Sequence, residues 1–320
     1  MSSALQLEIL DLRHFSASSL RPVLEEESRV WSERLRWDYR SSADLLLQYL
    51  DSRVLPGFVA VENGRIAGYA FCVYEEHKAI IGDVFSLPDT SVGVEGELLR
   101  HLIELLQHSP GIDRIECQLL LHPHGHHAEI FGQAGFRTFR RLFMELDLIG
   151  FRASSLPALP EGLALYPWRE NDYHPAGYLI AEAYEGHLDS YINDQYRSVS
   201  GSLRFLHNII RFPGCGLFDP LSSRTISRTQ DGSLAGVLLC SRVREDVGHI
   251  TQVCIAKALR GKQLGLQLIE SCAENLHERK FSGLTLTVTE ENANAVELYR
   301  KIGFTEKHAF DAMVWDRSWR

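Results

Sequence analysis

The chain has 320 residues, a hydrophobic fraction of 45%, a charged fraction of 23% and a formal net charge of -9 at pH 7. At roughly 150 residues per domain, this length predicts two domains. The negative charge argues against a nucleic-acid partner, because phosphate binding requires a basic surface. No apolar run is long enough to span a membrane. We therefore expect a soluble protein, and the charge slightly favours a cationic or neutral small molecule as its partner.

The N-terminal segment, residues 1–10, has no basic stretch followed by an apolar stretch, so we recognise no secretion signal and expect a cytoplasmic protein. The cysteines are scattered through mostly apolar segments without paired metal-ligand spacing, and we expect them to be buried reduced thiols. They are Cys72, Cys117, Cys215, Cys240, Cys254 and Cys272.

The sequence contains an internal repeat. Residues 63–68 recur as 231–236, and residues 131–136 recur as 299–304, with the same spacing of 168 positions in both cases (231 − 63 and 299 − 131). Two distant matches at one offset predict duplicated domains. The Ser- and Pro-containing stretch between the copies is the natural linker. We expect a first domain over 1–150, a linker over 151–162 and a second domain over 163–320.

In the first copy, strand-like runs at 57–61 and 66–74 flank an Asn-Gly pair, which predicts a β-hairpin. A strand at 79–85 follows, then a helix whose leucines between positions 98 and 106 repeat every three or four residues. A short helix closed by Gly135 ends the pattern.

The second copy repeats this order. Its hairpin pairs 224–228 with 234–243, its next strand covers 247–255, and its helix covers 264–276. A period-two run at 284–289 predicts another strand, and a short helix closed by Gly303 follows. The strand–helix–strand–helix order predicts a pair of parallel strands in each copy.

The segment after the 247–255 strand suits a pyrophosphate. A basic turn with Arg260, Gly261 and Lys262 leads into a helix that contains Gly265, so unpaired amides and the positive helix end point to one place. An ordinary strand-to-helix turn is the alternative. In the last helix, Asn292 can cap the N-terminus and Tyr299 lies beside the core face, where it could equally be a packed aromatic.

Together these segments resemble the GNAT superfamily of acetyl-CoA-dependent N-acetyltransferases. The family's pyrophosphate motif, Arg/Gln-x-x-Gly-x-Gly/Ala, is similar to Arg260-Gly-Lys-Gln263-Leu-Gly265, except that Gln263 replaces a glycine and predicts a strained or less accessible amide. The second motif, Asn-x-x-Ala-x-x-Leu-Tyr-x-x-x-Gly-Phe, is matched over 292–304. The resemblance implies an α/β (α+β) fold of two tandem domains. Each domain is a mixed, mostly antiparallel twisted sheet with a central splayed parallel pair, flanked by helices.

The resemblance also implies a cofactor site for acetyl-CoA as cosubstrate. Pantetheine would bond the main chain of Val253 and Ile255, and an amine would attack the thioester directly, without a covalent enzyme intermediate. Tyr299 would protonate the departing thiolate. The remaining cofactor-binding residues implied by the motifs are Arg260, Gly261, Lys262, Gln263, Leu264, Gly265 and Asn292.

The general base is open. Family members often carry a glutamate on the strand before the turn, but here His249, Thr251 and Gln252 occupy it. His249 is one candidate for the base, since its ordinary pKa suits neutral pH. The alternatives are a water-relayed base or a carboxylate of the first helical region, namely Glu182, Glu185 or Asp189.

The acceptor site is predicted over 183–197, which is rich in tyrosines and polar residues and borders the acceptor in this superfamily. We expect Tyr184, His187, Asp189 and Tyr191 to line it. The alternative is a polar helix surface with tyrosines as ordinary packing.

The first copy looks degenerate. Phe131 stands opposite Tyr299, and Asp89 and Glu95 in the corresponding turn would repel phosphate. The run His122-Pro-His124-Gly-His126-His127 could supply nitrogen ligands, but it has no acidic or cysteine companion nearby in sequence. We therefore expect an exposed loop, no metal site and a supporting role for this domain.

These observations predict an N-acyltransferase that moves an acetyl group from acetyl-CoA to a primary amine of a small molecule in the second domain, as a monomer or homodimer. A non-catalytic acyl-CoA-binding sensor or assembly module is the alternative, suggested by Gln263 and by the missing strand carboxylate. Tyr299 favours the enzyme, because only turnover needs an acid at that position.

Overall fold

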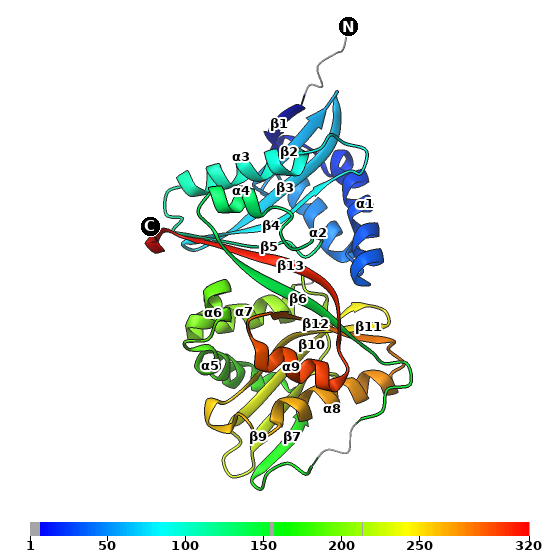
Figure 1. Cartoon of the computed structure of the whole chain (residues 1–320), viewed down its shortest axis with the longest axis vertical. Helices are drawn as coiled ribbons and strands as arrows, with labels where there is room; N and C mark the ends of the chain where they lie inside the picture. Colours follow the sequence, from blue (N-terminus) through cyan, green and yellow to red (C-terminus); the bar gives the residue numbers. More distant parts are fainter. Residues whose placement is uncertain (1–6, 154–156, 213, 320) are drawn as a thin grey trace. The chain divides into compact units, whose positions relative to one another are not determined.

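The computed structural model describes residues 7–153, 157–212 and 214–319. It divides into two compact units, each with a sheet covered by helices (Figure 1). Unit 1 comprises Met1–Arg140 with Phe310–Arg320, and unit 2 comprises Arg141–Ala309. Ser154 and Ser155 of the predicted linker lie outside the described residues.

Unit 1 holds the first copy of the repeat. Its sheet has the order β1-β2-β3-β4-β5-β13. The β4–β5 pair is parallel and the other pairs are antiparallel. The elements are β1 (Leu7–Asp11), α1 (Ala17–Leu35), α2 (Arg40–Asp51), β2 (Gly57–Glu62), β3 (Arg65–Glu75), β4 (Lys78–Ser86), α3 (Val94–His108), β5 (Arg114–Gln118), α4 (Ala128–Gln133), the start of β6 (Arg137–Asp147) and the end of β13 (Thr305–Asp316).

Unit 2 repeats the plan. Its sheet has the order β6-β12-β11-β10-β9-β7, with a short β8 that also pairs with β10. The β11–β12 pair is parallel and the others are antiparallel. Besides the end of β6 and the start of β13, its elements are β7 (Leu163–Pro167), α5 (Tyr173–Tyr184), α6 (Asp189–Ile192), α7 (Val199–Arg211), β8 (Leu217–Phe218), β9 (Arg224–Arg228), β10 (Leu234–Arg244), β11 (Val247–Ile255), α8 (Leu264–Glu278), β12 (Gly283–Thr289) and α9 (Ala293–Ile302).

The compact units do not follow the boundaries of the repeat, which we placed at 1–150 and 163–320. From Arg141 onward β6 pairs with β12 in unit 2. From Phe310 onward β13 belongs to unit 1, where residues 312–316 pair with β5. The last strand of each copy therefore completes the sheet of the other copy. Strand periodicity shows that a strand forms but not which neighbour it pairs with, so the sequence could not indicate this exchange.

Helices cover both faces of each sheet because strand side chains alternate. On β10, Leu238 and Cys240 pack in the cluster that includes α8 and α9, whereas Val237 and Leu239 pack in the cluster that includes α5 and α7. In unit 1, the Tyr69 hydroxyl on β3 donates to Glu27 of α1 at 2.6 Å, while its neighbours in β3 pack against α3. The predicted hairpins, helices and parallel pairs are confirmed.

None of the helices among the described residues is long and apolar enough to cross a membrane. All six cysteines are unpaired thiols, and five of them are buried as expected. Cys215 is exposed, which corrects the expectation for that residue. It lies between Gly214 and Gly216, directly before β8.

Candidate functional site

The parallel strands β11 and β12 separate part-way along their length, as predicted. Their pairing runs from Val247 opposite Gly283 to Ile250 opposite Leu286. Both strands continue further, β11 to Ile255 and β12 to Thr289, but no pairing between their described residues extends there. The edge of β11 from residue 251 onward is therefore not covered by β12, and a ligand can take the place of the missing partner.

The turn after β11 has the backbone that the sequence predicts. Gly261 has a φ of 79°, and Gln263 has a φ of 60° and a ψ of 13°, so both are left-handed. A residue with a side chain loses about 1–2 kcal/mol in this conformation, which glycine does not. Arg260, Lys262 and Gln263 have exposed side chains, whereas Leu264 is buried and anchors the helix start. The strain expected at Gln263 is present.

The first amides of α8 have no acceptor within the helix. The Gln267 N–H donates to the Gln263 carbonyl at 3.1 Å, so the N–H groups of residues 264–266 precede the first helical bond. They carry the positive end of the helix dipole, which favours a bound anion.

Two contacts fix the turn against the end of α5. The Arg260 guanidinium donates to the Ala183 carbonyl at 2.6 Å, and Lys257 forms an ion pair with Glu185 at 2.8 Å. Arg260 is thereby held beside the helix start, and its remaining N–H groups can still face a phosphate.

Helix α9 begins where expected, but not by the expected cap. Asn292 holds the N-cap position, and its side chain makes no capping hydrogen bond. Its carbonyl accepts instead from the N–H groups of Ala295 and Val296. On the same helix, Ala295, Leu298 and Ile302 pack against the core. Because its side chain is not used as a cap, the amide of Asn292 can interact with a ligand.

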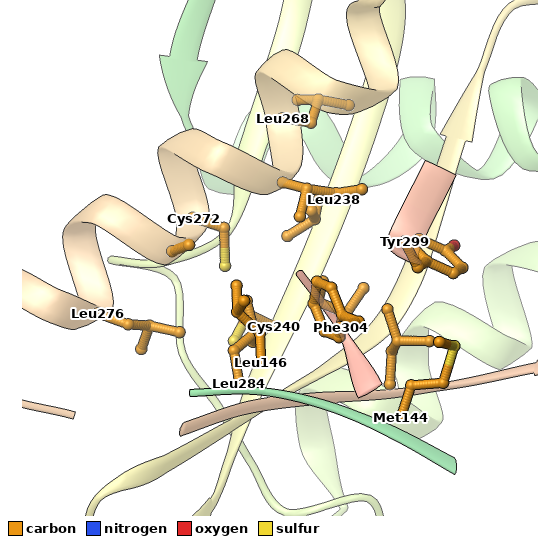
Figure 2. Close-up of a cluster of buried hydrophobic side chains, with 14 of the residues drawn as sticks. Met144, Leu146, Leu238, Cys240, Leu268, Cys272, Leu276, Leu284, Tyr299 and Phe304 are labelled. Atoms are coloured by element: carbon orange, nitrogen blue, oxygen red, sulfur yellow. The ribbon is translucent and has the colours of Figure 1, made fainter. Parts of the chain in front are cut away.

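Tyr299 combines a core position with an outward hydroxyl. Its side chain is 7% exposed, and its ring lies 5.8 Å from that of Phe304. Figure 2 shows the ring at the rim of the cluster with its hydroxyl pointing away from Phe304 and Met144. Burial, and next the charge of Asp189, raises the pKa of Tyr299 well above its usual value. The phenol therefore stays protonated at neutral pH and can donate.

His249 lies in an environment that suits a structural role. It is 5% exposed, and its Nδ1 lies 2.9 Å from Thr285 Oγ1. The Thr285 hydroxyl itself donates to the Gly248 carbonyl, so His249 Nδ1–H is the donor between the two side chains. Burial, with a smaller effect of the Arg141 charge, lowers the pKa of His249 to about 3. A group with so low a proton affinity is a weak base for an ammonium substrate.

Gln252 was not among the candidate site residues, yet it is central to the geometry. Its Oε1 accepts from the Tyr184 hydroxyl at 2.8 Å and from the Val253 N–H at 2.9 Å. Its Nε2 is buried and has no hydrogen-bond partner among the described residues. Exchanging the amide atoms would bring two donors together at Val253, so the orientation is set by these bonds. The sequence showed only a polar side chain in the strand expected over 247–255, and its burial comes from the structure.

Asp189, the first residue of α6, contacts the end of β12. Thr289 Oγ1 donates to Asp189 Oδ1 at 2.5 Å, and the Asp189 N–H donates to His187 Nδ1 at 3.1 Å. The rings of His187 and Tyr184 are 5.1 Å apart. Tyr191 is 47% exposed, with the Arg197 guanidinium 6.0 Å from its ring centre. Three of the four predicted acceptor residues therefore lie together, and Tyr191 follows Asp189 in the same short helix with a half-exposed side chain.

The segment from Tyr184 to Asp189 thus contacts both strands where they are no longer paired. Tyr184 bonds Gln252 on β11, and Thr289 on β12 bonds Asp189. The charge of Asp189 also acts on Tyr299 of α9. A carboxylate, a protonated phenol, an unpaired amide and a helix N-terminus are therefore contributed to one region of unit 2. This set can bind an anion and exchange protons with a bound amine.

In unit 1, Phe131 is fully buried at the position that matches Tyr299. The loop over 122–127 was expected to be exposed, but the structure shows otherwise. His122 and His127 are buried, and with His126 they surround the Glu95 carboxylate. Sequence distance hid this acidic companion, because Glu95 lies in α3 and the histidines follow β5. The expectation that the loop has no acidic companion is wrong.

Comparison with known proteins agrees with this geometry. Residues 188–304 match the Acetyltransferase (GNAT) family. The chain is similar to a GCN5-related N-acetyltransferase from Sphaerobacter thermophilus, with 17% identity, a TM-score of 0.66 and coverage of 98% of this chain and 96% of that chain. It is also similar to a tandem GNAT protein from the clavulanic acid biosynthesis pathway, with 14% identity, a TM-score of 0.62 and coverage of 98% and 99%. No curated protein sequence matches the chain.

Proposed function

We propose a specific reaction, on the premise that residues 188–304 match the Acetyltransferase (GNAT) family and that the whole chain has a GNAT-like fold. Unit 2 transfers an acetyl group from acetyl-CoA to a primary amine of a small molecule. The observation that carries the proposal is the glycine-type turn, which presents the unpaired amides of residues 264–266 beside the exposed edge of β11.

The amides at the start of α8 suit the diphosphate of acetyl-CoA, because they supply several donors and a positive dipole without a side chain in the way. Arg260 and Lys262 add positive charge at the rim of the turn. The pantetheine arm carries amide groups that can pair with the main chain of Val253 and Ile255. Since Gln252 holds the Val253 N–H in the structure, its side chain must release that bond when the arm pairs there.

Gln252 supports the same assignment. A buried donor without a partner costs about 1–3 kcal/mol, so such groups are expected where a ligand supplies the missing acceptor. The Gln252 Nε2 meets this condition. We propose that Gln252 Nε2 donates a hydrogen bond to an oxygen of the bound thioester or of the pantetheine arm.

The reaction requires two proton movements. The amine nitrogen attacks the thioester carbonyl, the carbon–sulfur bond breaks, and the sulfur leaves as a thiolate. Tyr299 donates its proton to that thiolate. The ammonium proton of the acceptor goes to Asp189, which is only partly buried and lies within electrostatic reach of Tyr299. Glu182 and Glu185 have exposed side chains, and Glu185 is paired with Lys257, so Asp189 is the better candidate.

A non-catalytic acyl-CoA-binding module is the second candidate. It is favoured by Gln263, which carries a side chain and backbone strain where the family has glycine, and by the Val253 amide that Gln252 already occupies. Both features would weaken cofactor binding or slow turnover without preventing binding.

One experiment separates the two candidates. The protein is mixed with acetyl-CoA and a panel of primary amines while free thiol is followed, and the melting temperature is recorded with and without acetyl-CoA. Amine-dependent thiol release supports the transferase. A higher melting temperature without thiol release for any amine supports the binding module. No change in either signal contradicts both candidates.

A further inference from the structure

Three histidines and one glutamate of unit 1 gather around a single point. Glu95 Oε2 lies 3.6 Å from His122 Nδ1, 3.5 Å from His126 Nε2 and 3.5 Å from His127 Nε2. One oxygen or nitrogen atom from each of the four residues lies within 4.8 Å of the others. They form three nitrogen donors and one oxygen donor in a common cluster.

The cluster lies at the start of α3. In the repeat, this position corresponds to the start of α8, where unit 2 has its proposed diphosphate turn. Gly93 precedes α3 with a left-handed φ of 99°, as Gln263 precedes α8, and Glu95 is the second residue of α3. The histidines come from the loop that joins β5 to α4. A carboxylate at this helix start repels a phosphate group, so the diphosphate role proposed for the start of α8 does not carry over to α3.

Hydrogen bonds on the far side of two of these residues fix which atoms face the centre. His122 Nε2 lies 2.9 Å from the Val84 carbonyl and must donate to it, which leaves a lone pair on Nδ1 toward Glu95. The Ser86 N–H and hydroxyl donate to Glu95 Oε1 at 3.2 and 3.1 Å, which leaves Oε2 toward the histidines. Backbone and hydroxyl partners of this kind orient the ligands of metal sites.

The inner atoms are short of partners. His127 Nε2 is buried and has no hydrogen-bond partner among the described residues, and its nearest acidic atom is Glu95 Oε2. A cation bound between Glu95 Oε2 and the three imidazole nitrogens would give these inward-facing atoms a shared partner.

We propose that Glu95, His122, His126 and His127 bind a zinc ion in a four-coordinate structural site. Zinc prefers imidazole and carboxylate ligands in a tetrahedron, and bond lengths of about 2.1 Å place neighbouring ligand atoms about 3.4 Å apart. The three distances from Glu95 Oε2 are 3.5 to 3.6 Å. Four protein ligands close the site, and the half-exposed His126 leaves a route for the ion from solvent. The ion would fasten the loop before α4 to α3.

Metal binding is measured on the full chain after removal of any affinity tag and dialysis against a chelator. Zinc is titrated by calorimetry, the bound metal per chain is determined by mass spectrometry, and cobalt is added as a spectroscopic probe of tetrahedral coordination. His126→Ala and Glu95→Gln are compared with the wild type. His126 is half exposed and Glu95→Gln keeps the Ser86 bonds to the side chain, so both variants should fold. His108→Gln on the exposed face of α3 is the matched control.

The wild type and the control should bind one zinc per chain, raise their melting temperature with zinc, and give the intense visible absorption of tetrahedral cobalt. Each ligand variant should bind zinc roughly 100-fold or more weakly, because loss of a ligand exceeds the 10–100-fold loss seen when only its outer partner is removed. Failure of the wild type to bind, or equal affinity of wild type and ligand variants, would overturn the proposal. Acetyl transfer takes place in unit 2 and is tested separately, so either proposal can fail alone.

Discussion

Replacing Tyr299 with phenylalanine removes one oxygen from the site and little else. The ring contacts with Phe304 and the cluster stay in place. The hydroxyl has no hydrogen-bond partner among the described residues, and Figure 2 shows it pointing out of the cluster. We therefore expect the free energy of unfolding of Tyr299→Phe to stay within about 0.5 kcal/mol of the wild type.

The effect on catalysis should be far larger. A positioned general acid contributes roughly 10²- to 10⁴-fold to the rate, which corresponds to about 3–5 kcal/mol of transition-state stabilisation. The KM for acetyl-CoA should not change, because the amides of α8 are untouched. Since burial and Asp189 raise the pKa of Tyr299, the wild-type kcat should show no loss from phenol ionisation up to about pH 9.

The assay follows thiol release with a chromogenic thiol reagent at saturating acetyl-CoA, from pH 7 to pH 9. Tyr178→Phe is the matched control, because Tyr178 is 62% exposed on α5. Its kcat should equal that of the wild type. If Tyr299→Phe keeps a kcat within twofold of the wild type over this range, Tyr299 is not the acid.

Three further changes test other parts of the structure. Gln263→Gly removes left-handed strain of about 1–2 kcal/mol from the folded state but raises the entropy of the unfolded chain by about 0.5–1 kcal/mol, so the free energy of unfolding in urea should rise slightly. Calorimetry should show tighter CoA binding, and weaker binding would contradict the assigned turn. Asp189→Asn keeps an acceptor for the Thr289 hydroxyl but loses the negative charge. The kcat/KM for the amine should therefore fall about 10²-fold or more, while the KM for acetyl-CoA stays the same. An unchanged kcat/KM would remove Asp189 from the mechanism. Burial raises the pKa of Glu27 in unit 1 from 4.5 to about 7, so the stability due to its protonated form is present below pH 4.5 and is lost as the pH rises through 7. Denaturant unfolding at pH 5 and pH 8 should show a loss on the order of 3 kcal/mol more for the wild type than for Glu27→Gln; equal losses would show that Glu27 is not the titrating group.

Local sequence patterns predicted many of the helices and strands. The two hairpins, the leucine spacing of α3 and the period-two run of β12 all formed as expected, because each depends on residues that are close in sequence. The strained backbone at Gln263 also followed from a motif with one substituted glycine. Patterns of this kind specify an element and the face that it buries.

Contacts between distant segments were not accessible in the same way. The sequence did not indicate that the ends of β6 and β13 would change units, because both are ordinary strands with no partner encoded in them. It did not bring Glu95 to the histidine loop, or the Tyr184 hydroxyl to Gln252, which are 68 positions apart. His249 looked suitable as a base by its ordinary pKa, and only its burial shows why that value does not apply.

A crystal structure with bound CoA tests the central claim most directly. The account predicts the diphosphate within hydrogen-bond distance of the amides of residues 264–266, with the pantetheine arm along β11 toward Tyr299. CoA bound elsewhere in the chain, or no CoA at this helix start at saturating concentration, would contradict it.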